Sequence, residues 1–207
     1  MLTNKIEKIF IIHYKPLINR KNYLINYFSN NNIKNFEFRD LYQRENLTPE
    51  LSNSYFKLNN LNPSQICITI EHIETYRHII NTGSYNKWYL ILEDDAKFTD
   101  NFIETLNLYM NNIPDDAEYL DINDYSLPTS INNTNNYWLP MNYTRTNCSY
   151  LINKYACEKL LAIIIPFKKA IDHELNAQFI HHNIKCYWSK IFIIRGHTNG
   201  SSYVQYR

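Results

Sequence analysis

Glycine is scarce in this sequence: the chain of 207 residues contains three, Gly83, Gly196 and Gly200. Loops that cradle phosphates need several glycines at fixed spacing, because the backbone must approach the phosphate closely. Neither a GxGxxG dinucleotide-binding loop nor a GxxxxGK phosphate-binding loop is present in this sequence. Dinucleotide-dependent dehydrogenases and P-loop NTPases are therefore excluded.

Cysteine pairs, excess charge and long hydrophobic runs are also missing. The four cysteines include no C-x-x-C pair, so the sequence does not support a structural zinc site. Isolated thiols are typical of a reducing compartment, although a disulfide between distant cysteines stays open. A net charge of +1 gives no support to nucleic-acid binding. No signal peptide or membrane-spanning run is visible, and we therefore expect a cytoplasmic protein.

Hydrophobic residues make up 44% of the chain and aromatic residues 15%, enough to bury one substantial core. We therefore expect a single domain over residues 1–207. Segments with strand patterns alternate with segments of helical spacing, which predicts an α/β sandwich built on a central sheet. The expected strands cover 8–14, 36–41, 88–92, 118–122, 148–152 and 187–194, and the expected helices cover 21–30, 64–82, 99–110, 154–165 and 171–181.

Local signals set several of the expected ends. Ser64 is the expected N-cap of its helix, and Gly83 is expected to end that helix. Pro166 is expected to end the helix 154–165. The polar segments 43–63 and 123–142 are expected to be irregular surface segments.

The run from Trp88 to Phe98 carries the strongest functional signal. Five apolar residues, typical of a buried strand, come before three consecutive carboxylates, Glu93, Asp94 and Asp95. Unpaired negative charge is costly to bury, so these groups are expected at a strand end beside water, a cation or a ligand. In an extended segment Glu93 and Asp95 point one way and Asp94 the other. Two oxygen donors aimed together suit Mg²⁺ or Mn²⁺ bound to a pyrophosphate, whereas the simpler alternative is a solvated turn that caps the next helix.

Short segments spread over nearly the whole chain occur in one order. They are 9–20, 38–40, 64–72, 92–95, 147–161 and 171–175. In this order they resemble glycosyltransferase family 25, the lipooligosaccharide galactosyltransferases and collagen hydroxylysine glycosyltransferases. Residues 92–95 match the family's LEDD element without change, and residues 147–161 match its Tyr-Leu-Ile…Ala…Leu-Leu block. The chain departs from the family pattern where His13 replaces Asn, Leu41 replaces Gly, Glu71 replaces Ser and His173 is inserted.

The resemblance implies a GT-A fold, an α/β Rossmann-like sandwich whose central sheet is mixed, mostly parallel and flanked by helices. It also implies an enzyme that transfers a hexose from a nucleotide sugar, commonly UDP-galactose or UDP-glucose, with inversion at the anomeric carbon. The implied cofactor is Mn²⁺ or Mg²⁺. The implied acceptor is a hydroxyl group of a glycan or of a hydroxylysine in a collagen-like polypeptide.

Departure of UDP leaves a diphosphate whose growing charge a divalent cation neutralises. Within the acidic run we expect Asp95 to be the principal metal ligand and Glu93 to bind the metal or the ribose. Asp94 is a metal, sugar or structural contact. His197 lies between two glycines and is a further candidate ligand, because neutral imidazole binds Mn²⁺. The alternative is a loop histidine with no role.

An inverting transfer also needs a base that takes the proton of the acceptor hydroxyl. Asp172 and Glu174 are the candidates, because they open a predicted helix near the end of the sheet. The alternative is that these carboxylates only complement the dipole of that helix.

Five further residues are candidate contacts of the nucleotide. They are His13 and Arg20 in the first strand-to-helix connection, Asp40 at the end of the second strand, His72 within a helix, and Arg145. Asp40 would bind ribose or uracil, and Arg145 would bind phosphate. Four of them also have a structural alternative: a turn residue for Asp40, a core residue for His72, and exposed side chains for the two arginines.

Two other classes of function stay open. An inactive glycosyltransferase-like domain, which binds nucleotide or glycan or scaffolds a partner, is favoured by the departures at His13 and Leu41 and opposed by the intact acidic run. A metal-dependent nuclease fits poorly with the near-neutral charge. The many tyrosines leave room for a homodimer.

Overall fold

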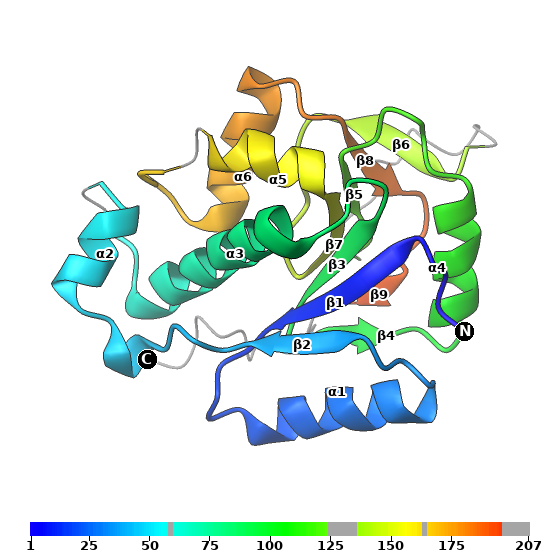
Figure 1. The fold of residues 1–207 in the computed structure, drawn as a ribbon, viewed down its shortest axis with the longest axis horizontal. Helices are drawn as coiled ribbons and strands as arrows, with labels where there is room; N and C mark the ends of the chain where they lie inside the picture. Colours follow the sequence, from blue (N-terminus) through cyan, green and yellow to red (C-terminus); the bar gives the residue numbers. More distant parts are fainter. Residues whose placement is uncertain (58–59, 124–135, 163–164, 196–207) are drawn as a thin grey trace.

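The computed structural model describes residues 1–57, 60–123, 136–162 and 165–195 (Figure 1). In this part of the chain, seven strands form one sheet in the order β2-β1-β3-β7-β5-β8-β6, and two short strands pair separately. The strands of the main sheet are β1 (Ile6–Ile12), β2 (Phe36–Arg39), β3 (Trp88–Glu93), β5 (Tyr119–Asp121), β6 (Trp138–Met141), β7 (Ser149–Asn153) and β8 (Cys186–Ser189). The separate pair is β4 (Lys97–Phe98) with β9 (Ile194–Arg195).

Helices connect most of these strands. They are α1 (Ile18–Asn30), the short 3₁₀ helix η1 (Arg44–Asn46), α2 (Pro49–Tyr55), α3 (Pro63–Thr82), α4 (Phe102–Asn111), α5 (Lys154–Leu161) and α6 (Ile171–His181). Within the described ranges, none of them combines the length and the apolar character needed to cross a lipid bilayer.

The main sheet is mixed. Strands β2, β1, β3, β5 and β8 run in one direction, and β7 and β6 run against them. The expectation of a mixed, mostly parallel sheet is therefore confirmed. β1 lies between β2 and β3, with Ile12 of β1 opposite Glu93 of β3. Because these three strands are parallel, their carboxyl ends meet at one edge, where ligands bind in open α/β sheets.

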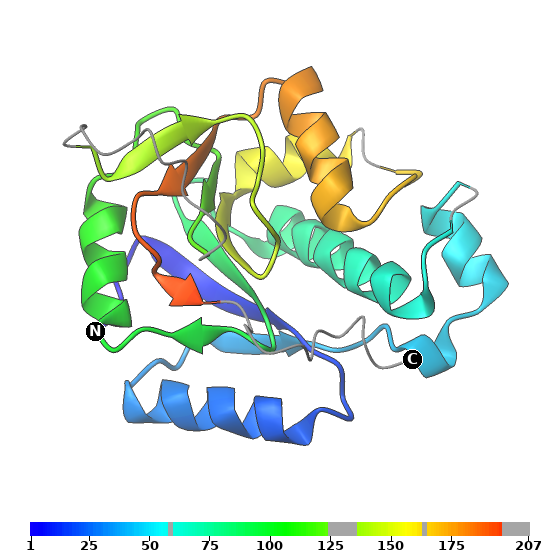
Figure 2. The ribbon, with the colours of Figure 1, turned by 180° about the vertical axis from the view of Figure 1, so that it is seen from behind.

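Helices cover both faces of the sheet, and this is why the central strands are apolar on both sides. α3, α5 and α6 pack on one face against strand residues such as Phe10 and Ile91. α1 and α4 pack on the other face against the alternate residues, such as Ile11 and Leu92. Figures 1 and 2 show α1 and α3 on opposite sides of the strands. The α/β sandwich predicted from the alternating pattern is confirmed.

α3 begins earlier than expected. Its N-cap is Asn62, whose side chain accepts the backbone N–H of Gln65, while the Gln65 side chain accepts the backbone N–H of Asn62. Pro63 occupies the first helical position, where a missing N–H leaves no bond unmade. The prediction of Ser64 as the cap is therefore wrong, because Ser64 lies buried inside the first turn. Gly83 ends the helix as predicted.

Several other expected boundaries also differ. The segment 43–63 is not irregular throughout, because it contains η1 and α2, and Thr48 caps α2 by accepting the N–H of Leu51. The strand expected over 187–194 is divided into β8 and β9, which belong to different sheets. The helix expected over 154–165 ends at Leu161. Part of the segment 123–142 forms β6, and its residues 124–135 lie outside the described residues.

Candidate functional site

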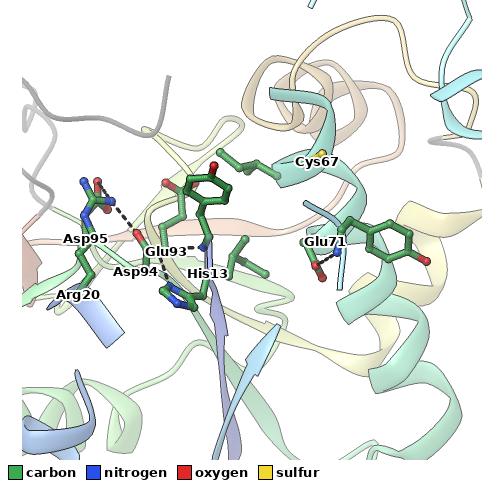
Figure 3. Close-up of a pocket in the computed structure, with 11 residues that line it drawn as sticks. His13, Arg20, Cys67, Glu71, Glu93, Asp94 and Asp95 are labelled. Atoms are coloured by element: carbon green, nitrogen blue, oxygen red, sulfur yellow. Dashed lines mark hydrogen bonds and ion pairs between the residues drawn. The ribbon is translucent and has the colours of Figure 1, made fainter. Parts of the chain in front are cut away.

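The acidic run lies at the carboxyl edge of the sheet. β3 ends at Glu93, whose backbone N–H donates to the carbonyl of Cys148 at 2.9 Å, and Asp94 and Asp95 lie in the turn that follows. The three carboxylates line one pocket together with the end of β1, Arg20 of α1, the loop after β2 and the first half of α3 (Figure 3). The pocket has a cavity volume of about 20 Å³, enough for about one water molecule. A nucleotide would therefore have to lie across its mouth.

Asp94 is the most heavily bonded residue of the acidic run, and its side chain is 4% exposed. Its Oδ2 accepts a hydrogen bond from His13 Nδ1 at 2.8 Å and one from the backbone N–H of Tyr14 at 3.1 Å. Its Oδ1 accepts one from Arg20 Nη1 at 2.6 Å (Figure 3). Because an ionised carboxylate only accepts, the proton in the His13 contact lies on Nδ1. Asp94 thus fastens the end of β1 to α1, and the protein itself engages both of its oxygens.

Arg20 also approaches the next carboxylate. Asp95 Oδ2 lies 3.7 Å from Arg20 Nη1. The extended strand ends at Glu93, and the turn after it brings Asp95 to the α1 side with Asp94. The alternation expected of an extended run therefore holds between Glu93 and Asp94 and fails at Asp95.

Glu93 extends to the α3 side, with its side chain 26% exposed, and its Oε1 lies 3.8 Å from His72 Nε2. The pKa of Glu93 is raised to about 7, first by burial and then by the negative charges of Asp94 and Asp172, while Arg20 lowers it.

His72 lies fully buried in the middle of α3, outside the lining of the pocket. Burial lowers the pKa of His72 to about 3, so the imidazole is neutral at neutral pH. Its Nδ1 lies 2.7 Å from the hydroxyl of Tyr150. The structure therefore places this histidine in the core, behind Glu93.

The two candidate bases at the start of α6 have different surroundings. Glu174 is buried, and it accepts hydrogen bonds from the backbone N–H of Lys168 at 3.3 Å and from Gln178 Nε2 at 3.0 Å. These contacts join the start of α6 to the segment before it. Asp172 is half-buried, and its negative charge raises the pKa of Glu93. Of the pair, Asp172 is thus the one whose charge reaches the acidic run.

Two other predicted residues are not brought into the pocket lining. Asp40 is half-buried and lies 3.4 Å from Lys21 Nζ. Arg145 is buried against β5, where its Nε donates to Asp121 Oδ1 at 3.1 Å and its backbone N–H donates to Asp121 Oδ2 at 2.7 Å. The guanidinium is therefore committed to Asp121 rather than presented to a phosphate. His197 lies outside the described residues.

The pocket also contains a carboxylate that the sequence reasoning missed. Glu71 of α3 is 2% exposed, and its Oε1 accepts the backbone N–H of Tyr42 at 2.6 Å. The pKa of Glu71 is raised to about 7 by burial, while the Tyr42 N–H and the charge of Arg39 lower it. Its signal was present in the sequence, because a charged residue on the apolar face of a helix calls for a polar partner.

The pocket contains carboxylate oxygens, the donor type that hard divalent cations prefer. Glu93 and Asp95 present carboxylate oxygens there, and the negative charge that raises the pKa of Glu93 is the kind that a cation balances. Over the described ranges, no three His, Cys, Asp or Glu side chains converge as a complete ligand set. Phosphate oxygens of a donor commonly complete such sites.

Comparisons with known proteins agree with this architecture. The sequence pattern described as Glycosyltransferase family 25 (LPS biosynthesis protein) matches residues 6–175, which is most of the chain. Among solved structures, the fold is similar to that of a glycosyltransferase involved in the glycosylation of the major capsid of PBCV-1. The TM-score is 0.53 at 10% sequence identity, with 95% of this chain and 94% of that chain covered. At this identity the likeness concerns the fold alone. No curated protein matches the sequence.

Proposed function

This chain belongs to glycosyltransferase family 25, and we propose that it transfers galactose or glucose from a UDP-sugar to a hydroxyl group of a glycan or of a hydroxylysine side chain. One observation carries the proposal. Three carboxylates line a pocket at the carboxyl edge of a mostly parallel sheet, the edge where nucleotides bind in such folds.

In this proposal the carboxylates of the acidic run have different roles in donor binding. Glu93 and Asp95 would hold a divalent cation, Mn²⁺ or Mg²⁺, which when bound neutralises the charge that grows on the diphosphate as UDP leaves. Asp94 is occupied by His13 and Arg20, so its role is to hold the end of β1 and α1 in place. Arg20 lies beside two carboxylates and is in position to contact a phosphate at the mouth of the pocket.

Asp172 is the base that we propose. Its carboxylate takes the proton of the acceptor hydroxyl while the acceptor oxygen forms its bond to the anomeric carbon. The bond from that carbon to the UDP oxygen breaks, and the electron pair leaves on the diphosphate. Attack from the side opposite the leaving group inverts the anomeric configuration. Asp172 is supported over Glu174 because it is less buried and its charge acts on Glu93. Asp172 Oδ1 accepts the backbone N–H of His173 at 2.9 Å, whereas Glu174 accepts hydrogen bonds from both Lys168 and Gln178.

A catalytically inactive glycosyltransferase-like domain is the second candidate. It is favoured because the described residues alone do not assemble a complete metal ligand set, and because His13 and Leu41 depart from the family pattern. Such a domain binds nucleotide or glycan without turnover. Incubation of the purified protein with Mn²⁺ and UDP-galactose or UDP-glucose separates the two, because the enzyme should release UDP slowly by hydrolysis and the inactive domain should release none.

The variant Asp95→Asn tests the assignment of the cation. We expect the Mn²⁺-dependent gain in UDP affinity to fall at least about tenfold, because an amide carries no negative charge for the ion. Titration calorimetry with UDP, in the presence and absence of Mn²⁺, measures this gain. Asp100→Asn is the matched control, since Asp100 is an exposed carboxylate shortly after the run and should leave the affinity unchanged. Undiminished Mn²⁺ dependence in Asp95→Asn would contradict the assignment.

A further inference from the structure

A chain of buried hydroxyl groups ends on the imidazole of His72. The hydroxyl of Tyr76 lies 2.7 Å from that of Tyr150, which in turn lies 2.7 Å from His72 Nδ1. All three side chains have 0% exposure. The other ring nitrogen, His72 Nε2, has no hydrogen-bond partner among the described residues and lies 3.8 Å from Glu93 Oε1. The arrangement therefore runs from the core to the acidic run.

The neighbours of the imidazole decide which nitrogen carries its single proton. An ionised Glu93 only accepts hydrogen bonds, so it attracts an N–H at Nε2 and repels a lone pair there. With Nε2 protonated, Nδ1 accepts a hydrogen bond from Tyr150, and the Tyr150 oxygen accepts one from Tyr76. Donation then runs from Tyr76 through Tyr150 to His72, and Nε2–H is left to attract the carboxylate of Glu93 across 3.8 Å.

We propose that His72 is a positioning residue that attracts the carboxylate of Glu93 electrostatically through Nε2–H, and that Tyr150 and Tyr76 set the tautomer that this requires. Glu93 is then held from the α3 side, and its other lone pairs face the mouth of the pocket. A buried ring nitrogen without a hydrogen-bond partner is uncommon in folded proteins, and the polar group that lies near this one is the carboxylate of Glu93. The consequence for cation binding rests on the proposed function of Glu93.

Nitrogen NMR of protein labelled with ¹⁵N-histidine measures the position of the proton. The signals of His72 are identified by their absence from the spectrum of His72→Gln. At pH 8 we expect these signals to be those of the Nε2–H form. Tyr150→Phe removes the donor to Nδ1, so the same signals should shift toward a mixture of the two tautomers. A wild-type protein with His72 in the Nδ1–H form overturns the inference.

The effect on the cation is measured by Mn²⁺ electron paramagnetic resonance in the presence of UDP, without turnover. His72→Asn is too short to reach Glu93, whereas His72→Gln places an amide N–H near the position of Nε2. We expect the Mn²⁺ affinity to fall about tenfold in His72→Asn and to recover largely in His72→Gln, as for other partners behind a metal ligand. Equal losses in both variants overturn the positioning role, because shape alone would then explain them.

Tyr119→Phe is the matched control for the buried hydroxyls. Its ring stacks on Tyr150 with centroids 4.7 Å apart, but its hydroxyl faces Thr144 and Asn147 instead of His72. This variant should keep the wild-type Mn²⁺ affinity, and a tenfold loss in it would overturn the role of the Tyr76–Tyr150 chain.

The proposed function and the positioning role fail in different ways. Wild-type protein that binds no Mn²⁺ with UDP overturns the proposed function, and the NMR result still decides where the proton of His72 lies. Wild-type binding that His72→Asn leaves unchanged overturns the positioning role and leaves the proposed function intact.

Discussion

Neighbouring carboxylates at the end of β3 have different roles because they face different elements. Asp94 faces α1, where His13, Tyr14 and Arg20 saturate its oxygens. Glu93 faces α3, and its side chain is more exposed than that of Asp94. A run of like residues in the sequence therefore contains one residue that supports the fold beside two for which we propose a role in donor binding.

Asp94→Asn should destabilise the fold far more than Asp95→Asn does. The amide keeps the size of the side chain but removes the charge that pairs with Arg20, and it turns one acceptor into a donor that faces other donors. Breaking a buried ion pair on one side costs about 3–5 kcal/mol. Urea unfolding of the two variants compares their free energies of unfolding, and equal small losses would contradict the structural role of Asp94.

Glu71 makes the stability of the fold depend on pH. The pKa of this carboxyl rises from its ordinary value of 4.5 to about 7 in the folded state. The stabilisation that follows is complete below the unfolded pKa and is lost as pH rises through the folded pKa. Between pH 5 and 7 the free energy of unfolding should therefore fall with rising pH. Glu71→Gln should flatten this decline by up to about 1.4 kcal/mol per pH unit.

Urea unfolding of wild type and Glu71→Gln at pH 5, 6 and 7 measures that difference. Glu93 contributes a decline of the same sign in both proteins, so the comparison isolates Glu71. Glu104→Gln is the control, because Glu104 is exposed on α4 and its variant should keep the wild-type slope. A parallel decline in Glu71→Gln would show that this carboxyl does not carry the dependence.

At the scale of an element, α3 depends on the side chains of its first turn. The reciprocal bonds between Asn62 and Gln65 satisfy backbone N–H groups that the helix itself leaves unpaired. Asn62→Ala should lower the free energy of unfolding by about 1 kcal/mol, as measured by urea or thermal unfolding. Asn60→Ala, which changes an exposed residue before the cap, should have no such effect. Equal stability of the two variants would contradict the capping role.

Elements were predictable where their signals are local. The apolar spacing of residues 171–181 predicts the bounds of α6, and the apolar run before Glu93 predicts β3. The strand expected over 187–194 failed because β8 ends at Ser189 and Ile194 pairs instead with Phe98 of β4, a distant partner that no local pattern reveals. The cap of α3 and the short α2 also have local signals in the sequence, Asn62 and Thr48.

At the scale of the whole molecule, the order of the strands could not be predicted from the sequence. β7 enters the sheet between β3 and β5 and runs against both, which no periodicity predicts. The position of the acidic run at a strand end and its nearness to the first connection were predictable. The contacts that give the residues of the run different surroundings were not predictable, because they join Asp94 to His13 and Arg20 across more than 70 residues of chain.

The strand that delivers the acidic run packs one set of side chains on α3 and the alternate set on α1. Glu93 continues the first set and Asp94 the second. The two residues are therefore supported by different parts of the hydrophobic core. Substitutions in the layer beneath Glu93 are therefore expected to leave the side chains beneath Asp94 in place.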